Sequence, residues 1–264
     1  MTLADVFAAA AAENRAVLMP YMMAGIPDPE SSVAMFEAMA EAGADAFEVG
    51  IPYADPLMDG PVIQAAGTAA LAAGTTLEVG LGIAAEVKAR TGKPCIAMTY
   101  SNPVFRDGPE TFARRAAAAG LDALIVADLP VDEAGPVAEA AAAHGLGLVL
   151  FAAPTTSADR LRRVADARPP FVYGIAEMGV TGERAEASQR AGELAGRIRS
   201  ATDVPVVLGV GISTPQAAAA AARVADGVIV GSALVRRVLE AASPAAAAEA
   251  LREATAALRA AMQR

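Results

Sequence analysis

Residues on which many enzymes depend are scarce in this sequence. It contains one histidine, His144, two lysines, Lys88 and Lys93, one cysteine, Cys95, and no tryptophan. A single cysteine cannot form an internal disulfide, and one histidine cannot build a metal site of several imidazoles. Any mechanism that needs a histidine cluster, a histidine-dependent metal or a Schiff-base lysine must therefore use these few positions.

Excess positive charge and long apolar runs are also missing. The 264 residues carry a net charge of -9, which argues against nonspecific binding to nucleic acid or to anionic membranes. The longest apolar stretches are interrupted too often to span a bilayer, and the first residues lack the basic region of a signal peptide. We therefore expect a cytoplasmic protein. A small phosphorylated ligand stays compatible with the charge, because backbone N–H groups can hold a phosphate.

Short apolar runs alternate with alanine-rich amphipathic segments along the whole chain. Continuous apolar character is typical of parallel strands that are buried on both faces. We predict a single (β/α)₈ TIM barrel over residues 1–264, with an extra short helix near Val62–Ala72 in the long connection after the second strand. A doubly wound open sheet is the competing arrangement. The predicted strands are Val17–Ala24, Ala46–Pro52, Pro94–Tyr100, Ala123–Asp128, Gly147–Ala152, Phe171–Ala176, Pro205–Gly211 and Gly227–Ser232.

The predicted second strand carries a carboxylate. Because side chains alternate across a strand, Phe47, Val49 and Ile51 share the outer face, and Glu48 faces the barrel interior. Barrel enzymes place their chemistry at the carboxyl ends of strands, and burial there raises the pKa of a glutamate toward the range useful for proton transfer. The alternative interpretation is a structural ion pair with an arginine, although no predicted strand carries one.

Two aspartates follow this strand in a loop that is stiffened by prolines. Asp55 and Asp59 lie in the run Tyr53-Ala-Asp-Pro-Leu-Met-Asp-Gly-Pro61. Both could serve turn geometry alone, since Asp and Pro are ordinary turn residues. On residue chemistry the two are equally good candidates for a second catalytic carboxylate.

Glycine-bearing segments follow the last three predicted strands, at Gly179–Gly182, Gly209–Ser213 and Gly231-Ser232. Glycines let backbone N–H groups approach an anion closely. Phosphate sites of barrels commonly lie after the seventh and eighth strands, beside a helix N-terminus. Since Gly231 and Ser232 lead directly into a predicted helix, Ala233–Ala242, we expect a phosphate group to bind at this end.

These segments together resemble the tryptophan synthase α subunit family. The similarity runs in collinear order from about Tyr21 to Val235, and the stretch from Glu48 to Gln64 is highly specific. The segments that carry it are Phe47-Glu-Val-Gly-Ile-Pro-Tyr53, Asp55-Pro-Leu-Met-Asp-Gly-Pro-Val-Ile-Gln64, Tyr100-Ser-Asn-Pro103, Val126-Ala-Asp-Leu-Pro130 and Gly179-Val-Thr-Gly182.

The resemblance implies a lyase of tryptophan biosynthesis that cleaves indole-3-glycerol phosphate to indole and glyceraldehyde 3-phosphate without a cofactor or metal. It also implies an α₂β₂ tetramer with the tryptophan synthase β subunit. Glu48 becomes the general acid and base, and Asp59, rather than Asp55, the carboxylate that faces the indole N–H. The other implied roles are Tyr173 beside the reacting carbon, Tyr21, Met98, Tyr100 and Ile125 around the indole, Thr181 in the loop that orders Asp59, and Gly182, Gly211, Gly231 and Ser232 at the phosphate.

The scarce residues agree with carboxylate chemistry. Lys88 falls in a predicted helix, while Lys93 and His144 precede strands, at the end of a barrel opposite to the chemistry. His144 is best explained as a helix C-terminal residue that interacts with the helix dipole. Schiff-base, metal-dependent and triosephosphate-isomerase-type mechanisms therefore lack their residues. Two alternatives to the α subunit stay open: a stand-alone lyase of the same ancestry, and a non-catalytic phosphate-binding activator of a partner.

Overall fold

The computed structural model describes residues 1–175 and 184–263, with the backbone alone for residues 184–188. Eight parallel strands pair in the order of the chain, and the eighth pairs with the first. The sheet therefore closes into a barrel, which confirms the predicted fold and excludes the open sheet. The strands are β1 Val17–Met23, β2 Phe47–Gly50, β3 Cys95–Thr99, β4 Ala123–Val126, β5 Gly147–Ala152, β6 Val172–Gly174, β7 Val206–Leu208 and β8 Gly227–Val230.

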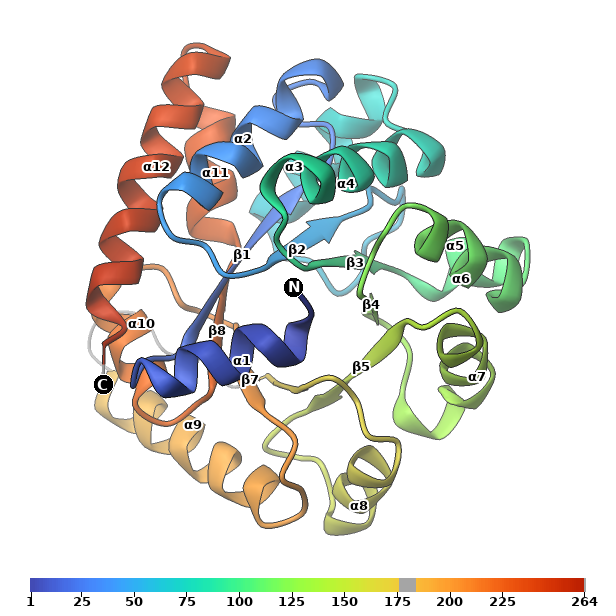
Figure 1. Ribbon diagram of the computed structural model, residues 1–264, viewed down its shortest axis with the longest axis vertical. Helices are drawn as coiled ribbons and strands as arrows, with labels where there is room; N and C mark the ends of the chain where they lie inside the picture. The colour runs from blue at the N-terminus through green and yellow to red at the C-terminus, as the bar shows by residue number, and fades with distance from the viewer. Residues whose placement is uncertain (176–183, 264) are drawn as a thin grey trace.

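Helices form a ring around the strands (Figure 1). The extra helix predicted after β2 is present as α3. Before α7 the chain forms a 3₁₀ turn, η1 Val131–Glu133, and the two stay separate because Pro136 has no N–H to continue the preceding turn. The helices are α1 Leu3–Ala12, α2 Pro29–Glu41, α3 Pro61–Ala72, α4 Leu77–Thr91, α5 Ser101–Arg106, α6 Pro109–Ala118, α7 Gly135–Ala143, α8 Ala158–Asp166, α9 Arg184–Arg199, α10 Pro215–Ala222, α11 Ser232–Glu240 and α12 Pro244–Ala261.

Oxygen-bearing side chains set the starts of six of these helices, among them α1, where Thr2 accepts a hydrogen bond from the Asp5 N–H. Asp28, Thr76, Ser157, Thr214 and Ser243 each accept a hydrogen bond from a backbone N–H of the first turn that follows. A proline follows directly after Asp28, Thr214 and Ser243. Proline suits the first position of a helix, because the N–H that it lacks would have no partner within the helix. The starts of α1, α2, α4, α8, α10 and α12 are thus encoded locally.

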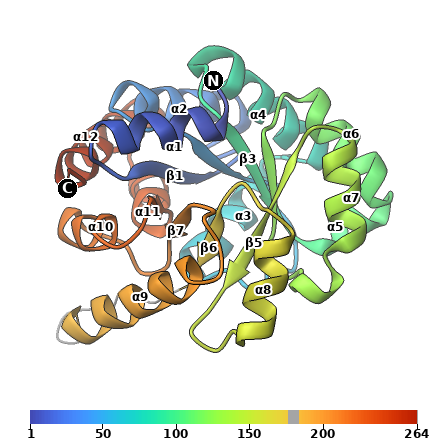
Figure 2. The same cartoon turned by 60° about the horizontal axis from the view of Figure 1, so that its bottom comes forward.

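The outer face of the sheet packs against the helices as the alternation on β2 predicts. Phe47 meets Phe36 of α2 edge to face, with ring centroids 5.3 Å apart, and Ile51 lies against Gly80 of α4. On the opposite side, α8 and α9 cover the outside of β5, β6 and β7 (Figure 2). The inner positions of the strands are left to fill the barrel and to build a site at one of its ends.

Among the described residues, no single helix combines the length and the apolar composition that crossing a bilayer requires; α3 and α4 meet those limits only when taken as a pair, bent by 105°.

The amino-terminal mouth of the barrel is closed by α1, which crosses it in Figure 1. Phe7 of this helix packs on Phe171, with ring centroids 6.1 Å apart. Next to it, the buried Asp45 accepts hydrogen bonds from the Leu18 N–H and from Arg15, both at 2.8 Å. One carboxylate thus joins β1 to the start of β2 and neutralises a buried guanidinium.

The same arrangement of an aspartate, a backbone N–H and a cation recurs twice at this mouth. The two further sets are Asp122 with the Cys95 N–H at 2.8 Å and Lys88 at 2.6 Å, and Asp226 with the Val206 N–H at 2.9 Å and Arg199 at 3.1 Å. Each joins a strand to the start of the next one. Lys88 is consequently a structural counter-ion, as its predicted place in a helix suggested.

Replacing Asp45 by alanine should destabilise the protein strongly, because the buried Arg15 guanidinium keeps only the more exposed Glu13 as a counter-charge and the Leu18 N–H loses its acceptor. We expect a loss of about 3 kcal/mol in the free energy of unfolding, measured by urea titration. The matched control is Asp159→Ala, which breaks an exposed i,i+3 pair with Arg162 and should cost less than about 1 kcal/mol. Equal losses in the two variants would show that the buried pair contributes nothing special.

Candidate functional site

A cavity of about 450 Å³ opens at the carboxyl ends of the strands, a volume typical of small-molecule sites. It collects most of the residues singled out from the sequence: Tyr21, Glu48, Asp59, Met98, Ile125, Tyr173, Gly211, Gly231 and Ser232 all line it. Asp55 and Tyr100 do not. Thr181 and Gly182 lie outside the described residues.

Glu48 lies on β2, opposite Tyr21 of β1 in the register, and is 3% exposed. Its Oε2 atom has no hydrogen-bond partner, and no cation pairs with it within the described part of the chain, so the structural ion-pair interpretation finds no support there. Burial, reinforced by the negative charge of Asp59, raises the pKa of Glu48 to about 8. The group is therefore protonated at neutral pH and can both give and take a proton.

Asp59 follows β2 in a loop that returns over the cavity. Its N–H donates to the Pro56 carbonyl at 3.1 Å, and its own carbonyl accepts from the Gln64 side chain of α3 at 2.8 Å. Burial raises the pKa of its carboxyl group, and a hydrogen bond from Tyr100 opposes that rise. Asp55, in contrast, is exposed and lies off the cavity wall. The path of the loop thus places Asp59, and not Asp55, at the cavity, a choice that residue chemistry alone could not make.

Two tyrosines are held beside Glu48 by glycines on neighbouring strands. A Cβ atom on Gly50 would lie 2.2 Å from the Tyr21 hydroxyl oxygen, and one on Gly209 would lie 2.2 Å from that of Tyr173. Only glycine leaves room for these rings. Burial first, and neighbouring carboxylates second, raise the pKa of both tyrosines well above the usual value. Both phenols consequently stay protonated and can donate hydrogen bonds.

Part of the cavity wall was not singled out from the sequence. Phe151 of β5 stacks against Tyr173 with ring centroids 5.3 Å apart and an interplanar angle of 34°. Strand alternation could have found it, since Phe151 and Tyr173 are partners in the β5–β6 register. The other unanticipated apolar residues of the wall are Met58, Ile63, Ile175, Val210, Ile212 and Ile229. Most come from loops and from α3, where no strand period applies.

The part of the cavity wall that follows β7 and β8 suits an anion. Helix α11 begins at Ser232, and its N-cap residue, Gly231, places no side chain over the helix end. The first N–H groups of a helix have no partner within it, and they carry partial positive charge. Gly211 has a φ of 76°, which favours glycine and brings its backbone to the same wall. The geometry therefore suits a phosphate group at the predicted end.

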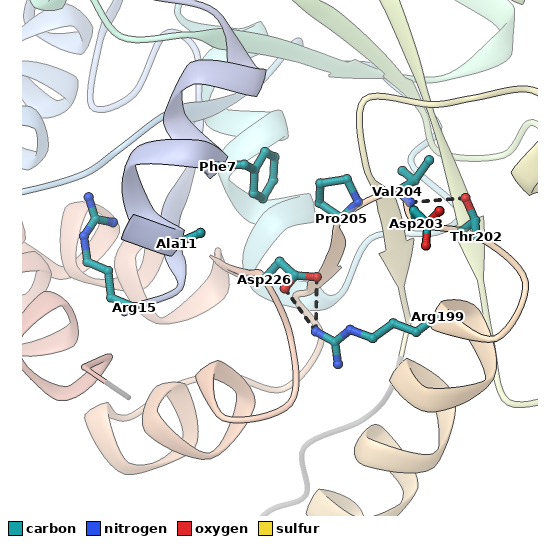
Figure 3. Close-up of a pocket in the computed structure, with 9 residues that line it drawn as sticks. All are labelled: Phe7, Ala11, Arg15, Arg199, Thr202, Asp203, Val204, Pro205 and Asp226. Atoms are coloured by element: carbon teal, nitrogen blue, oxygen red, sulfur yellow. Dashed lines mark hydrogen bonds and ion pairs between the residues drawn. The ribbon is translucent and has the colours of Figure 1, made fainter. Parts of the chain in front are cut away.

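A second cavity, of about 360 Å³, lies at the amino-terminal mouth. Figure 3 shows that its guanidinium groups come from Arg15 and from Arg199, which points at Asp226. Both arginines are already paired with aspartates that tie strands together. This cavity therefore belongs to the structural end of the barrel.

The scarce basic residues lie away from the carboxyl-end cavity. His144 is the C-cap residue of α7, as predicted, and its Nε2 atom lies 2.6 Å from the Glu110 carboxylate. Among the described residues, no group of three or more His, Cys, Asp or Glu side chains is arranged to hold a metal ion. Within the described chain, the titratable groups that line this cavity are the two carboxylates and the two tyrosines.

Comparison with known proteins shows how this barrel and site are related to others. The sequence model of the family described as "Tryptophan synthase alpha chain" matches residues 7–263. The chain belongs to this family. The tryptophan synthase alpha chain of Salinispora tropica is 48% identical, with 96% of this chain and 94% of the relative covered. A structure of Mycobacterium tuberculosis tryptophan synthase superimposes with a TM-score of 0.90 at 42% identity, covering 99% of this chain and 98% of the other. The alpha subunit from Legionella pneumophila gives a TM-score of 0.89 at 32% identity, covering 99% and 98%.

The raised pKa of Glu48 makes a prediction about stability. An unfolded chain returns this group to an ordinary pKa near 4.5, so the folded state binds more protons between about pH 4.5 and about pH 8. Its contribution to stability is complete below that window and is lost as the pH rises through it. The glutamine of Glu48→Gln cannot ionise, so this variant should not lose stability in the same way. As the pH rises from about 5 to about 8.5, its free energy of unfolding should increase by a few kcal/mol relative to that of the wild type.

Urea unfolding at both pH values measures this difference. Glu253→Gln, at an exposed position of α12, is the control and should show no such trend. A pH-independent difference between Glu48→Gln and the wild type would show that Glu48 is ionised in the folded protein.

Proposed function

We propose that this chain cleaves indole-3-glycerol phosphate to indole and glyceraldehyde 3-phosphate, a carbon–carbon lyase reaction, as the α subunit of a tryptophan synthase. The observation that carries the proposal is one cavity with two chemically different walls. On one wall lie Glu48 and Asp59, carboxylates without a cation in the described chain. On the other lies the uncapped start of α11.

Glu48 moves the protons in this scheme. As an acid it donates a proton to indole C3, which makes the bond between C3 and the glycerol carbon breakable. That bond then breaks, its electron pair returns to the indole ring, and the hydroxyl proton of the glycerol carbon passes to the Glu48 carboxylate as the aldehyde forms. No net proton or electron is consumed. A carboxyl group with a pKa of about 8 suits both halves of this exchange.

Asp59 serves the nitrogen of the indole. Protonation at C3 leaves positive charge on that nitrogen, and a carboxylate that accepts its N–H hydrogen bond stabilises the charge. Tyr173, which lies on the cavity wall beside Glu48, can donate a hydrogen bond near the reacting carbon. These two residues would lower the barrier without covalent contact with the substrate.

Binding would divide between the two walls. Tyr21, Met98 and Ile125 line the apolar part, which suits the indole ring, whereas Gly211, Gly231 and Ser232 suit the phosphate. The roles of Thr181 and Gly182, the cytoplasmic location and the lack of a cofactor stay predictions from the sequence.

Glu48→Gln should keep substrate affinity and lose roughly 10²-fold or more of turnover, because the amide fills the same volume but transfers no proton. Indole release from indole-3-glycerol phosphate, followed by steady-state kinetics, measures both quantities. Near-wild-type turnover would remove Glu48 from the mechanism.

Asp59→Asn should also lose most of the activity, and Asp55→Asn provides its control. The Asp55 side chain is exposed outside the cavity, so its amide variant should retain turnover when the chain is assayed alone. Loss in both aspartate variants would point to a general effect on the loop. A chain that binds glycerol phosphate but yields no indole would support the non-catalytic activator.

We propose a complex with a tryptophan synthase β subunit, of α₂β₂ stoichiometry. The Legionella relative is named as a subunit of tryptophan synthase, and Leu57 and Met58 expose 79% and 61% of their surface at the rim of the cavity. Exposed apolar side chains of this kind favour a protein contact.

Light scattering of the mixed subunits should give the mass of the tetramer, and indole turnover should rise on mixing. Turnover that is already high alone and unchanged by the β subunit would favour the stand-alone lyase.

A further inference from the structure

Tyr100 contacts the Asp59 loop and is not among the residues that line the cavity. It is the N-cap residue of α5, directly after β3, and is 3% exposed. Its ring packs on Tyr53 at the start of the loop, with centroids 5.4 Å apart. Its hydroxyl oxygen accepts a hydrogen bond from the Met58 N–H at 3.2 Å. Tyr100 therefore holds the loop at two points from a strand that is distant in sequence.

The same hydroxyl lies near enough to the Asp59 carboxylate to lower the pKa of that group, as a donated hydrogen bond would. A phenol has one hydrogen to donate and lone pairs to accept with, so both bonds can exist together. Tyr100 accepts from the backbone one residue before Asp59 and donates to the side chain of Asp59. One oxygen atom thus constrains both the position of the loop and the direction of its carboxylate.

One further hydrogen bond reaches the loop from a helix: the Gln64 side chain of α3 donates to the Asp59 carbonyl at 2.8 Å. The Leu57 and Met58 side chains are largely exposed. The Leu57 N–H bonds to Asp55 and the Asp59 N–H to Pro56, contacts that lie within the loop itself. Loops with few buried contacts open at low energetic cost. A long-range hydrogen bond from the barrel is accordingly the kind of contact that would keep such a loop in one place.

We infer that Tyr100 is a positioning residue, whose hydroxyl clamps the loop at Met58 and aims the Asp59 carboxylate into the cavity. The inference rests on the function proposed for Asp59. It replaces the binding role that the resemblance assigns to Tyr100, because the ring packs on Tyr53 and not on the cavity. A carboxylate displaced from its working position by even a small distance loses much of its effect on the reaction.

The electrostatics of the clamp agree with this role. The Tyr100 bond lowers the pKa of Asp59 against the rise that burial causes, and therefore favours the ionised form that accepts an N–H. The other ionisable groups around the clamp are Glu48 and Tyr21 in the cavity, and Asp128 on the far side of Tyr100. Asp128 is itself held by the Ser101 N–H and hydroxyl, both at 2.7 Å.

Tyr100→Phe tests the inference, because it keeps the ring and removes only the hydroxyl. For the cleavage of indole-3-glycerol phosphate we expect kcat to fall about 10-fold with little change in KM. The acid limb of the pH profile should move to higher pH, since Asp59 loses the bond that favours its ionised form. Hydrogen exchange at the Met58 amide should become faster.

Tyr53→Phe is the matched control. It removes the hydroxyl of the other ring in the pair, and that hydroxyl has no hydrogen-bond partner within the described residues. Its kinetics, pH profile and Met58 exchange should match the wild type.

The outcomes separate this inference from the proposed function. If Asp59→Asn is inactive while Tyr100→Phe keeps the wild-type kcat and pH profile, the clamp is overturned and the function stands. A higher KM with unchanged kcat in Tyr100→Phe would return the residue to substrate binding. An active Asp59→Asn variant would contradict the role of Asp59, and the role of Tyr100 with it. Faster exchange at Met58 in Tyr100→Phe alone supports the clamp independently of turnover.

Discussion

Burial of the Glu48 carboxyl group, with no cation paired to it in the described part of the chain, is the constraint on which the rest of the site depends. The closed barrel imposes it, because β2 lies between β1 and β3 and turns alternate side chains into an interior shielded from water. Desolvation raises the pKa of Glu48 to about 8, and the nearby Asp59 adds to the rise. An arginine within reach would have fixed the group as an anion and removed its capacity to donate a proton.

The carboxylates at the two mouths of the barrel differ in their partners. At the amino-terminal mouth, Asp45, Asp122 and Asp226 each hold a backbone N–H and a cation, and they join neighbouring strands. At the carboxyl-terminal mouth, no cation among the described residues pairs with Glu48 or Asp59, and both line a cavity. The first arrangement stabilises the fold, whereas the second leaves two carboxylates free to act on a ligand. The low histidine and lysine content fits this division, since the cations are used at the end where no chemistry occurs.

The sequence predicted those features that follow from periodicity. The eight strands and the inward direction of Glu48 came from apolar runs and alternation, which a parallel barrel obeys closely. The choice between Asp55 and Asp59 could not be made in this way, because it depends on how the loop folds back over the cavity. Tyr100 shows the same limit. By alternation it should face inward as Met98 does. The chain, however, leaves β3 at Thr99 and turns into α5, and the Tyr100 ring packs on Tyr53 of the loop and does not line the cavity.

The buried site lowers the stability of the folded protein, so the stabilising contacts must lie elsewhere in the structure. Glu48 is buried with an oxygen that has no hydrogen-bond partner among the described residues. The rings of two tyrosines lie against Gly50 and Gly209, so a larger residue at either glycine would clash with a ring. Such restrictions are tolerated when the surrounding structure over-determines them. The surrounding structure here includes the outer apolar layer and the aspartate–cation sets at the opposite mouth. Because these elements do not touch the cavity, stability and reactivity occupy separate ends of the barrel, and a change in the loops at one end need not weaken the other.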